Sequence, residues 1–214
     1  TATGYSFPSG HTQGSATFFI TLSQIVRRRW FSIVAIVLIL LVALSRIYLG
    51  VHWPVDVIAA VVLGVFVSFI FCTLVDKYFD DAAKLRKIFF RLQSSVVFIS
   101  IILFFIDLLY LKGSMKIQDF FKITGISTGA VYGFFVEERY IDFSAKDANK
   151  LLKIIRYIIG LAGTIGIMAG LKLILPGHYI ADFFRYGLVG AWVTLFWPAA
   201  GVRLRLFYRR SRVE

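Results

Sequence analysis

The sequence predicts an all-α membrane protein, a polytopic helical bundle of about seven transmembrane helices. Of its 214 residues, 58% are hydrophobic and only 17% are charged, which is fewer charges than a soluble domain carries. The mean hydropathy of +0.78 reflects long, continuous apolar stretches. These stretches lack the period-two alternation of membrane strands, so helices are favoured.

The predicted segments, in order, span residues 9–27, 30–50, 54–75, 88–111, 118–136, 152–174 and 179–200. A helix rises about 1.5 Å per residue, so each segment can cross a hydrocarbon core about 30 Å thick. Pro54 falls in the first turn of the third segment, where a missing N–H is harmless. Pro198 lies near the end of the seventh, and Asp107, near the outer end of the fourth, is expected to reach the membrane interface.

Glycines are spaced along one face of the fifth segment and one face of the sixth. They are Gly125, Gly129 and Gly133 in the fifth, and Gly160, Gly163, Gly166 and Gly170 in the sixth. Small residues at such spacing allow two membrane helices to approach closely. The sequence therefore predicts close-packing faces on both segments, with no need for a cofactor.

The basic residues give the orientation of the predicted bundle. Residues 27–29, 77–91, 139–156 and 203–212 contain 18 of the 24 lysines and arginines, and all four stretches lie at one end of the segments. By the positive-inside rule this end is cytoplasmic. The opposite end then faces the outside or a lumen.

The net charge of +12 is distributed between apolar segments and forms no single basic face, which argues against a nucleic-acid partner. Cys72 is the single cysteine and lies inside an apolar segment. The sequence therefore contains no disulfide framework and no CxxC metal site.

Two short runs contain most of the residues whose side chains could take part in catalysis or bind an anion. The first is P-S-G-H at residues 8–11, and the second is S-R-x5-H-x3-D at residues 45–56. Together they supply two imidazoles, a guanidinium, a carboxylate and two serines. This inventory is suited to attack on a phosphate group and to stabilisation of its charge without a metal. Two predicted segments separate the runs, so both emerge on the same, outer face.

This pattern resembles the second and third signature motifs of the type 2 phosphatidic acid phosphatase superfamily, which includes membrane lipid phosphatases and soluble vanadium haloperoxidases. The match covers residues 5–56 and is specific, because both motifs occur in order around a hydrophobic hairpin. A haloperoxidase is disfavoured because those relatives are soluble. The family's first motif, K-x6-R-P, does not occur in this sequence, which begins at Thr1. We therefore expect the chain to be a fragment or one piece of a longer protein.

The resemblance implies a catalytic role for three residues. His52 is the nucleophile and forms a phosphohistidine that water then hydrolyses. Asp56, one helical turn further on, accepts the other imidazole N–H and fixes the tautomer. His11 protonates the leaving oxygen. The residue types and their spacing are independently compatible with these roles.

Three further residues are implied to bind phosphate. Arg46 can hold two phosphate oxygens through its planar guanidinium, although an arginine at this depth can also simply extend to the interface. Ser9 and the backbone N–H of Gly10 can donate to the other oxygens at the start of a helix, whose dipole favours an anion. No metal and no cofactor is expected.

Residues 1–76 are predicted to be the second half of a six-helix lipid phosphatase core, with three transmembrane helices, and residues 77–214 a four-helix C-terminal membrane region. The second part contains another H-x3-D, at His178 and Asp182, and residues 127–130 are similar to residues 8–11, with Ala130 in place of His11. A degenerate repeat and a chance similarity between helical hairpins are both compatible with this pattern.

The function that follows is hydrolysis of a lipid phosphate or diphosphate by an integral membrane phosphatase. Its expected partners are the bilayer and a lipid substrate such as phosphatidic acid, phosphatidylglycerol phosphate or undecaprenyl diphosphate. The expected location is a bacterial cell membrane with the active site on the outer face. The sequence is compatible with a homo-oligomer and does not decide the oligomeric state. Two alternatives remain: a phosphotransferase acting on a lipid phosphate, and a non-catalytic lipid-binding or transport protein.

Overall fold

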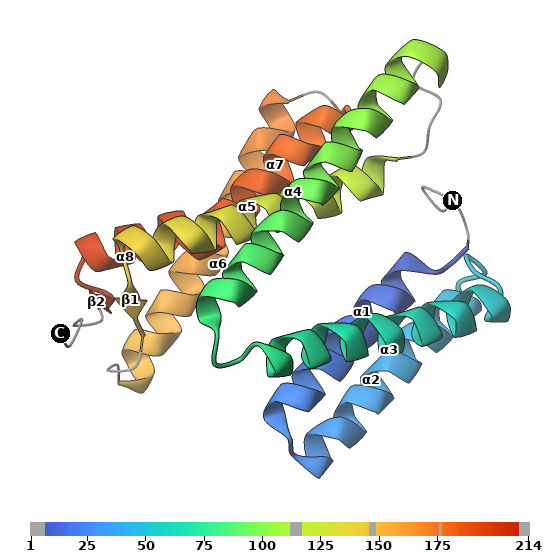
Figure 1. Ribbon diagram of the computed structural model, residues 1–214, viewed down its shortest axis with the longest axis horizontal. Coiled ribbons are helices and arrows are strands. Elements are labelled where there is room, and N and C mark those ends of the chain that lie inside the picture. The colour runs from blue at the N-terminus through green and yellow to red at the C-terminus, as the bar shows by residue number, and fades with distance from the viewer. Residues whose placement is uncertain (1–6, 112–116, 146–148, 176, 210–214) are drawn as a thin grey trace. The chain divides into compact units, whose positions relative to one another are not determined.

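The computed structural model describes residues 7–111, 117–145, 149–175 and 177–209 of the chain. The helices, in chain order, are α1 (Gly10–Val26), α2 (Arg29–Tyr48), α3 (Pro54–Lys77), α4 (Ala82–Ile106), α5 (Gln118–Tyr140), α6 (Lys150–Ile174), α7 (Tyr179–Ala191) and α8 (Trp197–Arg203) (Figure 1). Two short strands, β1 (Phe143–Ser144) and β2 (Tyr208–Arg209), pair antiparallel, with Phe143 opposite Arg209.

Four helical stretches are long and apolar enough to cross a membrane among the described residues. They are α2, α3, the continuous helix Ala82–Leu111 and α6, with mean hydropathies of 2.5, 2.8, 2.4 and 1.8. Large apolar side chains on these helices, such as Leu40, Leu41 and Leu44, are exposed and would face lipid. The predicted all-α membrane fold is confirmed, and each predicted segment corresponds to a helical stretch of similar bounds.

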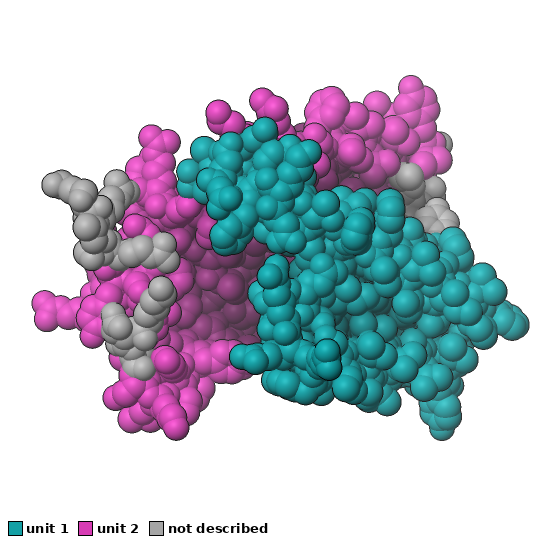
Figure 2. Space-filling model, turned by 60° about the horizontal axis from the view of Figure 1, so that its bottom comes forward, with its two compact units in different colours: residues 1–86 teal, residues 87–214 magenta. Residues whose placement is uncertain are grey.

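The contacts divide the chain into two compact units, Thr1–Arg86 and Lys87–Glu214 (Figure 2). The division lies inside α4, a little beyond the boundary expected at residue 76. The assignment of residues 1–76 to a lipid phosphatase core and of residues 77–214 to a C-terminal membrane region stays a prediction. Unit 1 contains both sequence motifs that resemble a phosphatase site.

Within unit 1, α1 and α3 pack closely along their length. Gly64 of α3 allows this approach, because a Cβ atom at that position would lie only 2.6 Å from the Cβ of Ala16. Ala16 and Ala60 are fully buried between the helices. The hydroxyl of Ser68 donates to the carbonyl of Thr17 on α1, at 2.9 Å, and ties the two helices together near mid-length.

Within unit 2, the predicted glycine face of α5 packs against α7. A Cβ atom on Gly129 would lie 2.8 Å from the backbone nitrogen of Ala191, and Gly125 approaches the backbone of Phe183 equally closely. On α6, Gly160 and Gly163 lie against the rings of Trp197 and Trp192, whereas no described atom lies near Gly166 or Gly170. The close-packing prediction is therefore correct for the fifth segment and for only the first half of the sixth.

The seventh predicted segment is not one regular α-helix. A π-helical turn, Trp192–Phe196, separates α7 from α8. Pro198 has no N–H to donate back to the carbonyl of Thr194, and this loss favours a change of helical geometry there. The rings of Trp192 and Trp197 stack across the change, 6.1 Å apart. The indole N–H of Trp192 donates to the carbonyl of Gly160 on α6, at 3.0 Å.

Asp107 is buried, whereas a side chain that extends to the membrane interface would be exposed. Its side chain is fully buried, in a π-helical turn that follows α4. A hydrogen bond links it to the side chain of Tyr179, at the start of α7. The expected exposure was wrong because a carboxylate at a helix end can be buried when a neighbouring helix supplies a donor, as the Tyr179 side chain does here.

Candidate active site

Both sequence motifs lie at helix starts on the same end of the α1–α3 pair. Ser9 is the residue immediately before α1, and Trp53 immediately precedes α3. The backbone N–H of Ser9 donates to the backbone carbonyl of Asp56, at 3.2 Å. This bond joins the P-S-G-H run directly to the H-x3-D run, which are more than forty residues apart in the sequence.

His52 lies two residues before α3 and faces Asp56 in the first turn of that helix. The Nδ1 atom of His52 lies 3.7 Å from Oδ2 of Asp56, and each side chain is 9% exposed. The same Oδ2 accepts the backbone N–H of Trp53, at 2.9 Å. Asp56 therefore holds the start of α3 in place and also presents negative charge to the imidazole, and its orienting role toward His52 stays a prediction.

Arg46 lies in the last turn of α2, just before the connection that contains His52. Its Nε donates to the hydroxyl of Ser45, at 3.3 Å, and that hydroxyl donates to the carbonyl of Val42, at 2.7 Å. Gly50 adopts a positive φ of 66° in the connection, a conformation that glycine adopts without strain. The half-buried Arg46 side chain is thus held at its base, and the guanidinium nitrogens Nη1 and Nη2 are donors of the kind that bind an anion.

Ser9 is supported by a residue that the sequence reasoning did not select. The hydroxyl of Thr12 donates to the Ser9 hydroxyl, at 3.1 Å, and both side chains are fully buried. Because the Ser9 oxygen accepts this bond, its own proton is available for another acceptor. The signal was present in the sequence, since a serine and a threonine three residues apart at a helix start share one face.

His11 and Gly10 lie in the first turn of α1 and are exposed. In the described part of the chain, His11 makes no hydrogen bond or ion pair. The structure thus brings Ser9, His52 and Asp56 together, and places Arg46 in the last turn of α2, six residues before His52. His11 lies in the first turn of α1, next to this group, and has no hydrogen-bond or ion-pair partner among the described residues.

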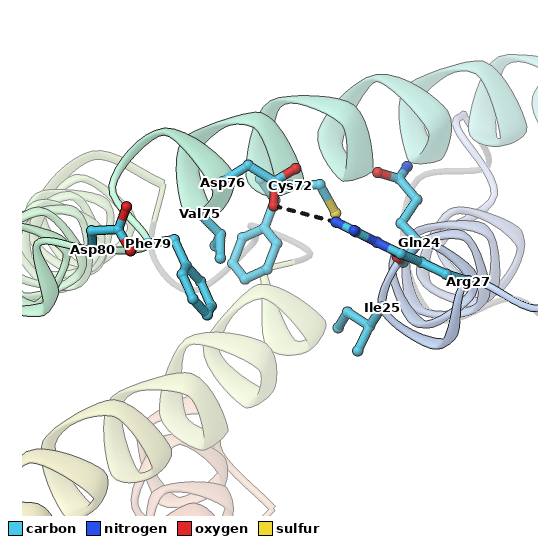
Figure 3. A pocket seen from close by; sticks show the side chains of 9 residues that line it. Gln24, Ile25, Arg27, Cys72, Val75, Asp76, Phe79 and Asp80 are labelled. Atoms are coloured by element: carbon cyan, nitrogen blue, oxygen red, sulfur yellow. Dashed lines mark hydrogen bonds and ion pairs between the residues drawn. The ribbon is translucent and has the colours of Figure 1, made fainter.

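The cavity found in unit 1 lies away from these residues. It has a volume of about 850 Å³ and is lined by the last turn of α1, the last turns of α3 and the residues just after it. Figure 3 shows Arg27 and Asp76 facing each other across it, 4.0 Å apart and both largely exposed. None of the predicted site residues lines this cavity, which lies at the opposite end of the α1–α3 pair from the two motifs.

Comparison with curated proteins gives matches to phosphatases over part of the chain. An undecaprenyl-diphosphatase of Sulfolobus acidocaldarius is 46% identical over 68 residues, covering 32% of each protein. A lipid A 4'-phosphatase of Bacteroides thetaiotaomicron is 34% identical over 74 residues, covering 35% of this chain and 33% of the relative. A phosphatidylglycerophosphatase B of Bacillus subtilis is 32% identical over 89 residues, covering 37% of this chain and 41% of the relative.

The matched region thus spans about a third of the first two relatives' own length. No solved structure matches the chain. Two family models match different parts of it. The model of the PAP2 superfamily matches residues 1–80, and that of the PAP2 superfamily phosphatase transmembrane extension matches residues 121–210. Together these matches confirm the resemblance carried by the two motifs: the chain belongs to the PAP2 superfamily.

Proposed function

We propose that this chain carries the catalytic residues of an integral membrane enzyme that hydrolyses a phosphate or diphosphate group on a lipid. The observation that supports the proposal best is the contact between His52 and Asp56 at a helix start that is hydrogen-bonded to Ser9. A nucleophile, the group that orients it and a phosphate-binding hydroxyl then meet at one end of two packed helices.

In this proposal, Arg46, Ser9 and the backbone N–H of Gly10 bind the phosphate group. The guanidinium of Arg46 neutralises two oxygens, while Ser9 donates its hydroxyl proton to a third. The start of α1 adds unpaired backbone N–H groups and the positive end of a helix dipole, both of which favour an anion. These donors stabilise the charge that develops on the phosphoryl oxygens during transfer.

His52 attacks the phosphorus atom in the first step. Because Nδ1 faces Asp56, its proton is directed to the carboxylate and Nε2 carries the lone pair. A P–N bond forms as the P–O bond to the lipid breaks, and His11 transfers a proton to the leaving oxygen. In the second step His11 takes a proton from water, the water oxygen attacks phosphorus, and the P–N bond breaks to release phosphate and restore both imidazoles.

The proposed reaction needs no metal and no cofactor. Two imidazoles supply nucleophile and acid, and a guanidinium supplies the positive charge that a metal would provide in other phosphatases. In the described parts of the chain, no three His, Cys, Asp or Glu side chains come together as metal ligands. Metal independence stays a prediction, and phosphate release in the presence of a chelator tests it.

The substrate would enter laterally, with its tails in the bilayer and its head group at the outer face. The matched relatives are named for undecaprenyl diphosphate, lipid A and phosphatidylglycerophosphate, all of which carry a phosphate on a lipid. For this chain we propose a lipid phosphate of that kind, in a bacterial cell membrane with the site outside. The 18-to-6 distribution of basic residues supports this orientation.

The decisive experiment measures phosphate release from phosphatidic acid, phosphatidylglycerol phosphate and undecaprenyl diphosphate by the full-length purified protein. His52→Ala should reduce release by several orders of magnitude, and Arg46→Lys, which keeps the charge but loses the planar fork, should reduce it substantially. Wild-type protein quenched in alkali should retain an acid-labile phosphate that His52→Ala lacks. Normal release by the His52→Ala protein would overturn the proposal.

A further inference from the structure

The residue pattern around α3 recurs around α7. Three residues reappear at identical spacing and the fourth is replaced by a similar one: His52, Asp56 and Gly64 correspond to His178, Asp182 and Gly190, and Ser68 corresponds to Thr194. In each set the aspartate is buried in the first turn of its helix, and the glycine is buried further along it. The hydroxyl of the last residue donates to the glycine carbonyl, at 2.8 Å from Ser68 and 3.0 Å from Thr194.

The glycines also meet the facing helix in the same way. A Cβ atom on Gly64 would lie 3.1 Å from the carbonyl oxygen of Gln13 and 3.1 Å from the backbone nitrogen of Thr17. A Cβ atom on Gly190 would meet the carbonyl oxygen of Ile126 and lie 2.7 Å from the backbone nitrogen of Ala130. Each glycine thus sits over one turn of the facing helix, between a carbonyl and the N–H group four residues later.

These contacts fix how α5 corresponds to α1. Gln13 pairs with Ile126 and Thr17 with Ala130, so that Ser9 corresponds to Lys122 and His11 to Thr124. The similarity of residues 127–130 to residues 8–11, expected from the sequence, is not the register that the helix packing supports. Thr124, the counterpart of the proposed acid, is 2% exposed and can supply no imidazole.

The counterpart of the nucleophile has also lost its orienting carboxylate. His178 is exposed, and its Nδ1 accepts the backbone N–H of Ile180, at 3.3 Å. Asp182 is fully buried and accepts the amide N–H of Gln118, at 2.7 Å, and a guanidinium N–H of Arg185. In the described residues no ion pair joins His178 to Asp182.

We propose that the three-helix unit α5–α7 is a second copy of the three-helix unit α1–α3, in which the acid and the orienting contact have been replaced and the aspartate serves helix packing. Asp182 links the start of α7 to Gln118 at the start of α5 and neutralises Arg185 on its own helix. Removing one member of such a pair leaves a buried charge without its partner, which destabilises far more than removing both. The inference concerns unit 2 and stands apart from the activity proposed for unit 1.

A double-mutant cycle in the full-length protein in detergent tests the packing role. Asp182→Asn and Arg185→Gln should each lower the melting temperature, and the double variant should lower it by clearly less than the sum. Lys153→Gln, an exposed position on α6, is the matched control and should leave it unchanged. Additive effects, or no effect of either single change, would overturn the assignment of the pair to packing. This result does not depend on whether the protein releases phosphate.

The helix register has its own test. Gly190→Ala should lower the melting temperature because its Cβ atom meets backbone on α5, whereas Gly166→Ala, beside which no described atom lies, should not. Equal tolerance of both would overturn the register.

Phosphate release then separates packing from chemistry. His178→Ala should retain release within about tenfold of wild type, roughly 1.4 kcal/mol of barrier. A His178→Ala protein that melts normally but loses as much activity as His52→Ala would show that the second copy is catalytic. If wild-type protein releases no phosphate at all, the proposed function fails. The melting temperatures of the Asp182 and Arg185 variants, and of Gly190→Ala and Gly166→Ala, then still test the inference about α5–α7.

Discussion

Replacing Thr12 by valine isolates one hydrogen bond beneath the proposed phosphate site. Valine has nearly the shape of threonine and lacks only the hydroxyl. In the protein that hydroxyl donates to Ser9, at 3.1 Å, and both side chains are fully buried. The substitution therefore leaves the packing of α1 against α3 intact and frees the Ser9 hydroxyl to rotate away from phosphate.

The size of the effect follows from the free energy of one neutral hydrogen bond. Such a bond contributes about 0.5–1.5 kcal/mol. If all of it orients Ser9 toward the transition state, the rate should fall about 2- to 12-fold, since about 1.36 kcal/mol corresponds to a factor of ten. The loss should appear in kcat as well as in kcat/KM, because the bond between Ser9 and the phosphoryl oxygens strengthens as charge develops.

The assay is steady-state phosphate release by full-length protein in detergent, with the melting temperature measured alongside. Thr12→Ser keeps the hydroxyl and should restore most of the rate. Thr21→Val, made two to three turns further along α1, is the matched control for adding a methyl group to this helix. A Thr12→Val rate indistinguishable from wild type, in a folded protein, would refute the positioning role. A Thr12→Ser rate as low as that of Thr12→Val would refute it too.

Two further predictions concern topology and proton transfer. In a Cys72→Ser background, a cysteine at Gly177 should react with an impermeant thiol reagent added outside, whereas one at Ala145 should not; the reverse labelling would place the proposed site in the cytoplasm. His11→Ala should lose most activity with a natural lipid phosphate and less with a phenolic ester, whose leaving group needs no proton. Equal losses with both esters would argue that His11 only binds phosphate.

The fold was largely predictable because hydrophobicity alone determines where a membrane helix can lie. The residues of each predicted segment are helical, with ends displaced by a few residues. The π-helical turn Trp192–Phe196 was harder to predict from the sequence. Pro198 lies near the end of the segment, but the form of the turn depends on how Trp192 and Trp197 pack against α6.

The candidate site was predictable to the extent that short spacing along the chain determines proximity. His52 and Asp56 are four residues apart, and His52, two residues before α3, faces Asp56 in the first turn of that helix. The hydrogen bond from Ser9 to Asp56 joins different helices, and no spacing rule gives it. The burial of Asp107 against Tyr179 was missed for the same reason, since it depends on packing between α4 and α7.

Close packing at Gly64 links the stability of unit 1 to its chemistry. Gly64 lies two turns beyond Asp56 on α3, where an added Cβ would lie 2.6 Å from that of Ala16. Gly64→Ala should therefore push α1 and α3 apart, and overpacking of this kind costs about 1–3 kcal/mol. Because the two helix starts carry Ser9 and Asp56, joined by a single 3.2 Å backbone bond, the catalytic geometry should loosen as well.

We thus expect Gly64→Ala to lower both the melting temperature and kcat, although residue 64 touches no substrate. Gly14→Ala is the matched control: it lies on α1 with no described atom near its would-be Cβ, and alanine in a helix stabilises by up to about 1 kcal/mol relative to glycine. A Gly64→Ala protein that melts at a lower temperature yet keeps its full kcat would show that the separation of α1 and α3 does not control the active-site geometry. A protein with unchanged stability would show that the helices absorb the extra methyl group.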